Sequence, residues 1–301
     1  MDDDTIEKYY KAGNILATAL KKAKEKVKPG VKLIEITQLI EDELIRKKGY
    51  SPAFPLNIGI NEITAHYACP PGDMTAFPEE GVVKLDAGVH IEGYTTDMAV
   101  SVGYGTDKYQ VLIEAAEAGL ETAIKTIKAG VRVKEVGIAV EHTIRSFGVR
   151  PISNLSGHLM TQFQLHAGVS VPNVRVENAS SSYRFREGDI FALEPFTTYE
   201  SAAGYVKNGK EICIYSLIKR KTRNMPSQVT RLINRIWGER RTLPFSFRWY
   251  SQLPQAILNR LESQKILHGY PVLIEASLQP VAQAEKTILV QRDGCEIITE
   301  E

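Results

Sequence analysis

The apolar positions of the first fifty residues recur with the spacing of amphipathic helices. Residues 5–27 form a lysine-rich helical pattern, and a second pattern runs over 33–47. In the second, Ile36, Ile40 and Leu44 recur at intervals of four residues, which places them on one side of an α-helix. The sequence therefore predicts two helices, each with an apolar face that packs against other parts of the chain.

The pattern changes in the stretch Val82–Val100, which is rich in β-branched residues. Such a stretch is typical of two strands joined by a turn, and we expect the turn near Glu92. The resulting register sets Asp86 opposite Ala99 and diagonal to Asp97, so both carboxylates lie on one face, about 7–8 Å apart at Cα. Alone, such a hairpin could present both acids to solvent. Alternatively, the two acids bind one or two cations.

The order of motifs repeats after about one hundred residues. The sequence GVKL at 30–33 returns as GVRV at 130–133, and a helical pattern follows each copy. The matched positions are Ile40 with Val140, Glu41 with Glu141, Leu44 with Ile144, Gly49 with Gly148, His66 with His166 and, with one residue inserted, Asp86 with Glu194. We therefore expect two αβ halves of common design, about 1–110 and 111–200 plus the C-terminus, with a functional site where they meet.

A basic segment follows the second half. Between Ile218 and Tyr250, nine lysines and arginines accompany a single acid, Glu239. Two helical patterns occur in this region, so we expect a small helical insertion. The predicted domains are a main domain, 1–204 and 269–301, and a helical insertion subdomain, 205–268. The basic face of the insertion could contact ribosomal RNA through its phosphates, or it could be a solvated surface without a partner.

Composition limits the remaining possibilities. The chain has 301 residues, a net charge of +1 and 43% hydrophobic residues, which is ordinary for a soluble globular protein. No apolar run reaches the roughly 18 residues that span a membrane, and the acidic N-terminus does not resemble a secretory signal. Cys69, Cys213 and Cys295 are scattered and form no CxxC motif. They predict reduced thiols in the cytoplasm rather than disulfides or a zinc site.

Five ionisable residues stand in or beside apolar strand patterns, where burial without a partner is costly. They are Asp86, Asp97, His158, Glu194 and Glu285. Each one alone could be a satisfied core histidine or an edge-strand acid. Together, an oxygen-rich set with one imidazole and no thiolate suits two divalent ions, Mn, Fe, Co or Zn, in a hydrolase.

Motifs along essentially the whole chain support this interpretation. In order they are KLDAGVHIEGYTTD, NLSGHLM, LHAGVSVPN, FALEPF, TLPFSFRW and GYPVL. The set resembles the type II methionine aminopeptidases of archaeal size. The resemblance implies an α+β pita-bread fold, in which pseudo-two-fold αβ halves surround a curved antiparallel sheet, with a helical insertion before GYPVL. It also implies a dinuclear metal aminopeptidase that removes the initiator methionine from nascent proteins and peptides and prefers a small second residue.

The same resemblance implies a role for each candidate residue. The five residues above would be metal ligands, with Glu194 also acting as general acid and base. His66 and His166 would handle the substrate outside the group of ligands. The positions that would line the methionine pocket are Phe54, Leu165, Phe196 and Tyr270, of which Phe54 and Phe196 could equally be ordinary core. The chain departs from the family beside Glu285, where Ala284 and Lys286 stand in place of an aromatic residue and a histidine.

Two alternatives stay open at this point. A prolidase or Xaa-Pro aminopeptidase uses the same fold, although Asp86 comes too early in the chain for the extra N-terminal domain usual in that group. A non-catalytic pita-bread protein could bind ribosomal RNA or protein partners, although such relatives typically lose metal ligands. We expect a monomeric, cytoplasmic enzyme that acts on peptide and nascent polypeptide N-termini, with no membrane association.

Overall fold

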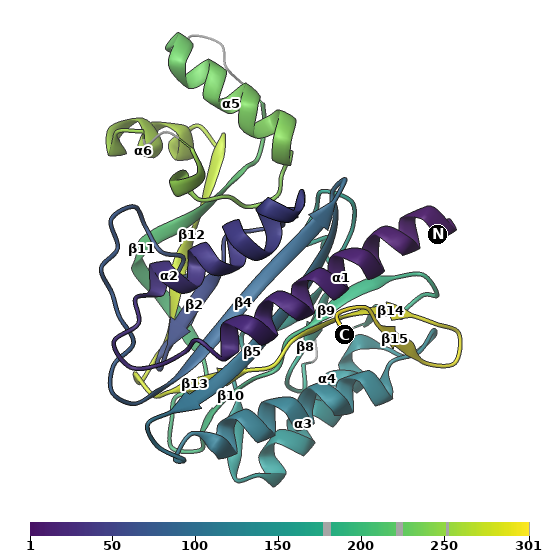
Figure 1. The fold of residues 1–301 in the computed structure, drawn as a ribbon. Coiled ribbons are helices and arrows are strands. Elements are labelled where there is room, and N and C mark those ends of the chain that lie inside the picture. Colours follow the sequence, from purple (N-terminus) through teal and green to yellow (C-terminus); the bar gives the residue numbers. More distant parts are fainter. Residues whose placement is uncertain (177–181, 221–224, 251–252, 301) are drawn as a thin grey trace.

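The structure of the chain is a computed structural model that describes residues 1–176, 182–220, 225–250 and 253–300 (Figure 1). The helical elements are α1 (Asp3–Lys24), α2 (Leu33–Gln38), the π-helical segment η1 (Leu39–Ile45), the 3-10 turn η2 (Arg46–Lys48), α3 (Gln110–Thr126), α4 (Val133–Ser146), α5 (Ser227–Arg240), the 3-10 turn η4 (Phe247–Trp249) and α6 (Gln255–Ser263). The strands are β1 (Ser51–Pro52), β2 (Asn57–Ile60), β3 (Ile63–Ala65), β4 (Gly81–Ile91), β5 (Tyr94–Tyr104), β6 (Val149–Pro151), β7 (Ser156–Met160), β8 (Ser170–Pro172), β9 (Ile190–Leu193), β10 (Phe196–Tyr199), β11 (Val206–Leu217), β12 (Leu267–Glu275), β13 (Val281–Gln283), β14 (Lys286–Val290) and β15 (Cys295–Ile297). No helix in these ranges is long and apolar enough to cross a bilayer.

The strands pair in an antiparallel manner throughout the described chain. The sheets are β1-β4-β2 with β5 paired to β4, then β13-β10-β6, β11-β12-β3 and β15-β14-β9-β7-β8. In Figure 1, α1 lies along β4 and β5, and α3 and α4 lie side by side against the second half. An isolated bridge between Ala99 and Glu285 connects the β4–β5 hairpin to the start of β14. This mixture of helices and curved antiparallel sheets confirms the predicted α+β class.

The central hairpin, β4–β5, has the predicted register. Asp86 pairs with Ala99, so Asp86 and Asp97 lie on the same face as expected. The chain reverses at Glu92 and Gly93, whose φ angles are 53° and 88°. Positive φ at both central positions belongs to the two-residue turn that matches the twist of the flanking strands. The turn therefore fixes which residues of the hairpin share a face.

The two halves form the same local structure at their repeated GV motifs. Gly30 and Gly130 have φ angles of 80° and 91°. The N–H of Gly30 donates to the carbonyl of Phe77 at 2.9 Å, and that of Gly130 donates to the carbonyl of Phe185 at 2.8 Å. The helices after the two motifs then pack into separate apolar cores. These matched contacts support the predicted repeat.

The helix of the first half differs from the prediction in one turn. The interval 30–49 is one residue longer than the matching interval 130–148. The extra residue is accommodated in η1, whose wider turns bury Ile45, whereas Leu44 is only half-buried. In the regular helix α4, the matching residue Ile144 is fully buried. The regular spacing of apolar residues predicted an uninterrupted α-helix. That prediction is wrong in this half, because the spacing does not reveal the added residue.

The basic insertion contains less helix than the sequence predicted. Its first twelve residues or so belong to β11, which pairs with β12 in the sheet that also holds β3. Figure 1 shows α5 and α6 beyond the ends of these strands. The two helices share a core with Ile233, Phe245 and Leu261. The domain boundary at 205–268 stays a prediction.

Two of the nine cations between Ile218 and Tyr250, Arg240 and Arg248, are mostly buried, and the side chain of Arg248 is 14% exposed. Arg240 is 4% exposed, and its guanidinium donates to the carbonyls of Pro52 and Ala53 at 2.9 and 2.6 Å. Burial lowers the pKa of Arg240 to about 10. Arg231 and Arg235 are exposed on α5, so the basic face is narrower than the count of charges indicated.

Candidate metal centre and active-site cavity

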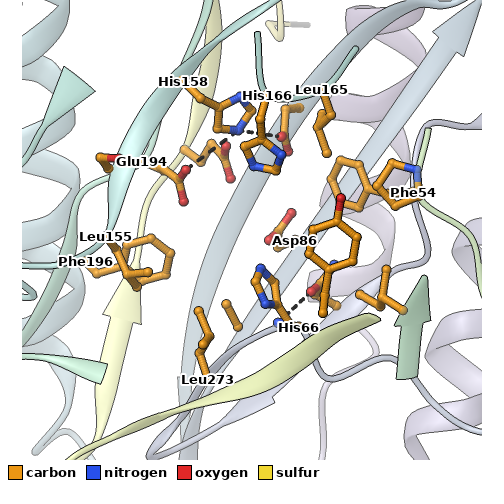
Figure 2. Close-up of a pocket in the computed structure, with 18 of the residues that line it drawn as sticks. Phe54, His66, Asp86, Leu155, His158, Leu165, His166, Glu194, Phe196 and Leu273 are labelled. Atoms are coloured by element: carbon orange, nitrogen blue, oxygen red, sulfur yellow. Dashed lines mark hydrogen bonds and ion pairs between the residues drawn. The ribbon is translucent and has the colours of Figure 1, made fainter. Parts of the chain in front are cut away.

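The hairpin and the second half bring the predicted metal ligands to one place. Asp86 lies in β4, Asp97 in β5 and His158 in β7, whereas Glu194 directly follows β9 and Glu285 directly precedes β14. Asp97, His158 and Glu285 each offer a ligand atom within 4.8 Å of the others. In Figure 2, the side chains of Asp86, His158 and Glu194 point toward the same space. The structure therefore gathers all five predicted ligands.

The contacts within this group leave oxygen atoms without partners. The Nε2 atom of His158 lies 3.5 Å from Oδ2 of Asp97 and 3.7 Å from Oε1 of Glu194. Within the described ranges, Oδ1 of Asp86 and Oδ1 of Asp97 are buried and have no hydrogen-bond partner. Buried oxygens in this condition are costly unless a cation binds them. The site therefore fits a divalent metal ion.

The electrostatics of the four acids lead to the same conclusion. Burial raises the pKa of Asp97 to about 8. Burial and the neighbouring carboxylates together raise the pKa values of Asp86, Glu194 and Glu285 well above their usual range. Carboxylates this close, with little water around them, cannot all be ionised at once. Divalent cations remove this conflict, and oxygen donors with one imidazole suit Mn, Fe, Co or Zn.

Sequence reasoning missed two side chains that hold the acids in place. The hydroxyl of Thr287 accepts from the N–H of Asp97 and donates to its carbonyl, both at 2.8 Å. The amide of Gln283 donates to Oε2 of Glu285 at 3.0 Å. Both are polar residues that stand close to Glu285 in otherwise apolar strands. This position was the one feature of the sequence that could have marked them as supports of the site. The contact of Thr287 spans 190 residues of sequence, so its partner could not be inferred.

Two further histidines, His66 and His166, line the cavity beside the acids. The ring Nδ1 of His66 lies 3.1 Å from the carbonyl oxygen of Pro271. A carbonyl only accepts hydrogen bonds, so Nδ1 carries the proton and Nε2 is left as an acceptor. The ring of His166 lies 4.3 Å from that of His158, centroid to centroid. Burial lowers the pKa values of His66 and His166, and for His166 the neighbouring His158 and His66 lower it further. Both rings are therefore neutral at pH 7.

A cavity of about 230 Å³ lies beside the acids. The predicted substrate residues that line it are Phe54, His66, Leu165, His166, Phe196 and Tyr270. Figure 2 shows Phe54 and Leu165 on one side of the cavity, with Phe196 and Leu155 on the other. Leu155, Ile214, Pro244 and Leu273 also line the cavity and were missed. In the sequence, these four are indistinguishable from ordinary core residues.

Buried carboxylates and imidazoles beside a cavity large enough for a side chain define a metal-dependent hydrolytic site. Comparison with known proteins agrees with this class. The chain belongs to metallopeptidase family M24, whose family model matches residues 7–221. It is similar to the methionine aminopeptidase of Pyrococcus horikoshii, with 41% identity over 300 residues that cover 98% of this chain and 99% of the relative.

Solved structures show the same fold. One similar structure is a methionine aminopeptidase from Thermotoga maritima, with a TM-score of 0.73, 22% identity, and coverage of 100% of this chain and 98% of that chain. Another is a thermophilic Arx1, with a TM-score of 0.81, 16% identity, and coverage of 99% and 91%. At these identities the structures establish the shared pita-bread architecture and nothing about activity.

Proposed function

We propose that this chain hydrolyses the N-terminal methionine from peptides and nascent proteins, with a preference for a small second residue. The observation that carries the proposal is the buried group of four carboxylates and His158 at one wall of a cavity with apolar and aromatic lining. Relatives of the same length that are named methionine aminopeptidases support it. A prolidase-like peptidase and a non-catalytic binding protein have no comparable support.

We assign two divalent ions, Co, Mn, Fe or Zn, to the five clustered residues. The proposed ligands are Asp86, Asp97, His158, Glu194 and Glu285. Ions held there would act as Lewis acids and lower the pKa of a water molecule toward neutrality. The buried oxygens without partners and the raised pKa values of the acids support this assignment.

Glu194 is the proposed general acid and base. It directly follows β9, and its side chain is 16% exposed, so it reaches the cavity while remaining mostly buried. Burial and the charges of Asp97 and Asp86 raise the pKa of Glu194. A carboxyl group with a raised pKa can take a proton from the attacking water and return it to the leaving amine.

The two cavity histidines have complementary roles in this proposal. His66 donates from Nδ1 to the carbonyl of Pro271, so its Nε2 can accept a hydrogen bond from the N–H of the scissile amide. His166 is a neutral imidazole and can donate to the carbonyl oxygen of that amide as negative charge develops. This division follows from the tautomer of His66, because one neutral ring nitrogen cannot both accept and donate.

The apolar lining accounts for the methionine side chain. Phe54, Leu165 and Phe196 are at most 8% exposed, and Tyr270 completes the aromatic lining. An unbranched thioether fits such a slot and gains sulfur–aromatic contacts. We attribute the preference for a small second residue to crowding directly beside the scissile bond, before the chain leaves the cavity.

Metal-dependent release of methionine tests this function. The protein is treated with a chelator and assayed on Met-Gly-Met-Met before and after Mn(II), Co(II), Fe(II) or Zn(II) is added. We expect at least one metal to restore release of the first methionine. The Asp97→Ala variant should lose about 10³-fold or more in kcat/KM because a metal ligand is missing.

Alternative substrates separate this function from its alternatives. Leu-Gly-Met-Met and Met-Lys-Met-Met should be cleaved more slowly than Met-Gly-Met-Met, and an Xaa-Pro dipeptide whose first residue is not methionine should not be cleaved. Preferential cleavage of the Xaa-Pro dipeptide would favour the prolidase-like alternative. A folded protein that cleaves no peptide with any of the metals would favour the non-catalytic one.

Location and partners beyond the substrate belong to the proposal as well. We propose a monomeric, cytoplasmic enzyme that contacts the ribosome through the exposed cations of the insertion, such as Arg231. Arg240 takes no part because it is buried. Reversal of charge at Arg231 and Lys219 should weaken salt-sensitive co-sedimentation with ribosomes. Unchanged co-sedimentation would contradict the contact.

A further inference from the structure

A groove of about 520 Å³ continues the active-site cavity toward the surface. The residues that line both spaces are Leu165, His166, Pro244 and Tyr270. The groove is otherwise lined by residues 162–164, 216–218 and 241–242. It therefore runs between the second half of the repeat and the insertion, and it begins where the cavity ends.

The wall of the groove is fixed at several points. The N–H of Phe163 donates to the carbonyl of Gly93 at 2.7 Å, and the side-chain amide of Gln162 donates to the carbonyl of Glu92 at 2.9 Å. On the other side, the hydroxyl of Thr242 donates to the carbonyl of Phe163. The wall is thus tied to the hairpin turn and to the insertion. A groove built in advance binds an extended chain with less loss of conformational entropy.

The direction of a bound peptide follows from the chemistry of the site. The N-terminal residue must lie at the acids, and the rest of the chain must leave the cavity. Each residue of an extended chain advances about 3.3–3.6 Å, so the third residue lies beyond the scissile amide by roughly two such steps. His166 and Tyr270 line both the cavity and the groove, so the groove is a continuous way out of the cavity.

The groove carries one positive charge. Among the described residues that line it, Arg241 is the one side chain with a full charge at neutral pH. Arg241 is exposed, and its guanidinium lies 5.7 Å from the ring centroid of Trp237. The remaining lining is neutral and includes Ile218, which is 50% exposed. An exposed arginine beside a bound chain attracts acidic side chains and repels basic ones.

We propose that this groove binds the third and following residues of the peptide substrate, and that Arg241 makes acidic side chains there favourable. The proposal rests on the aminopeptidase function above and adds a determinant of specificity to it. Two sequences with the same first and second residues would then be processed at different rates.

Three substrates with the same scissile bond test the proposal. They are Met-Ala-Glu-Glu-Glu, Met-Ala-Lys-Lys-Lys and Met-Ala-amide. We expect kcat/KM for the acidic peptide to exceed that for the basic peptide by about threefold to fivefold at low salt, which is the range of an exposed ion pair. The ratio should approach one at 0.5 M NaCl, because salt at about that concentration screens exposed charges.

Variants of Arg241, which directly follows α5, and of Arg231, which lies within α5, assign the charge preference to one residue. Arg241→Gln should bring the acidic-to-basic ratio close to one, and Arg241→Glu should invert it. Arg231→Gln is the matched control, because Arg231 is an exposed arginine on α5 that does not line the groove. It should keep the wild-type ratio. Because each ratio is taken within one variant, a general loss of activity does not affect it.

The outcomes separate the groove from the function on which it rests. If the wild type cleaves Met-Ala-amide but shows the same rate for both pentapeptides, the groove proposal is wrong and the aminopeptidase function stands. An unchanged ratio in Arg241→Gln, or an equal change in Arg231→Gln, also overturns the role of Arg241. If no substrate is cleaved with any metal, the proposed function fails and the groove proposal fails with it.

Discussion

The two halves of the repeat place matching glutamates in opposite surroundings. Glu41, in η1, is 1% exposed. Its carboxylate accepts hydrogen bonds from the guanidinium of Arg248 at 2.8 Å, the indole N–H of Trp249 at 2.6 Å and the N–H of Leu56 at 2.9 Å. The first half has therefore made this position part of its interior.

The second half keeps the matching position near its surface. Glu141, in α4, is half-buried. It accepts from the side chain of Arg145 at 3.0 Å and from the N–H of Arg175 at 2.8 Å. Arg145 lies one helical turn away, so this pair is the common surface arrangement within a helix. The matching positions hold the same residue type, but Glu41 is a buried hydrogen-bond acceptor and Glu141 forms a partly exposed ion pair.

Glu41 is buried at the place where the insertion packs against the first half. Arg248 and Trp249 follow α5, so their contacts with Glu41 tie the insertion to the first half. The ring of Trp249 also lies 4.5 Å from the guanidinium of Arg46 and 4.7 Å from that of Arg240. The two halves thus share the backbone of the GV motif, whereas the helix that follows it differs in the half that holds the added subdomain.

Replacement of the two glutamates should have very unequal effects on stability. Glu41→Ala leaves Arg248 buried without its partner, so we expect it to cost about 3–5 kcal/mol. Glu141→Ala removes a partly exposed pair and should cost at most about 1 kcal/mol. Denaturant-induced unfolding of both variants measures the difference. Equal costs would contradict the distinction between the halves.

The acids of the metal centre are a second contrast with Glu41, because no lysine or arginine in the described part of the chain forms an ion pair with them. In the metal-free protein the folded-state pKa of Asp97, about 8, exceeds its unfolded value. Its contribution to stability is therefore present at low pH and is lost as the pH rises through about 8. Asp86, Glu194 and Glu285 act in the same direction.

Metal binding should consequently stabilise the protein more at pH 8 than at pH 6.5. Each proton that a metal ion displaces contributes about 1.4 kcal/mol per pH unit. The lowered pKa of Lys84, about 7, affects both forms of the protein and largely cancels in the difference. Thermal or denaturant unfolding with and without Mn(II) at both pH values measures the stabilisation by the metal. A metal effect that does not depend on pH would contradict the raised pKa values.

The glycines that start the two helices should behave alike. Gly30 and Gly130 both have positive φ, and a side chain at either position would meet no atom within 4 Å. The cost of Gly30→Ala or Gly130→Ala is then only that of the left-handed backbone, about 1–2 kcal/mol. Unfolding experiments should give the same loss for both variants. Clearly different losses would mean that the repeat is not equivalent at its backbone.

The sequence was most informative where a pattern is local. The register of β4–β5 follows from the turn at Glu92 and from the spacing of Asp86 and Asp97, so the pairing of these two acids was predictable. His158, Glu194 and Glu285 were candidates because each is an ionisable residue in an apolar strand context. Their convergence depends on pairings between distant strands, which no local pattern reveals.

The parts that could not be predicted depend on distant partners or on one added residue. The burial of Arg240 depends on carbonyl groups nearly two hundred residues away, so its charge was counted with the surface. The strand β11 was assigned to a helical insertion because its partner β12 follows fifty residues later. The π-helical turn requires a comparison of both halves, in which the interval 30–49 contains one more residue than the interval 130–148.

The number of divalent ions bound per chain tests whether the two halves together build the metal centre. The protein is stripped with a chelator, titrated with Mn(II) by calorimetry and then analysed for bound metal. We predict two ions per wild-type chain, release of protons on binding, and loss of the tighter site in Asp97→Asn, while Glu141→Gln keeps both ions. A wild-type chain that binds no Mn(II), or an Asp97→Asn variant that binds it as the wild type does, would contradict the assignment.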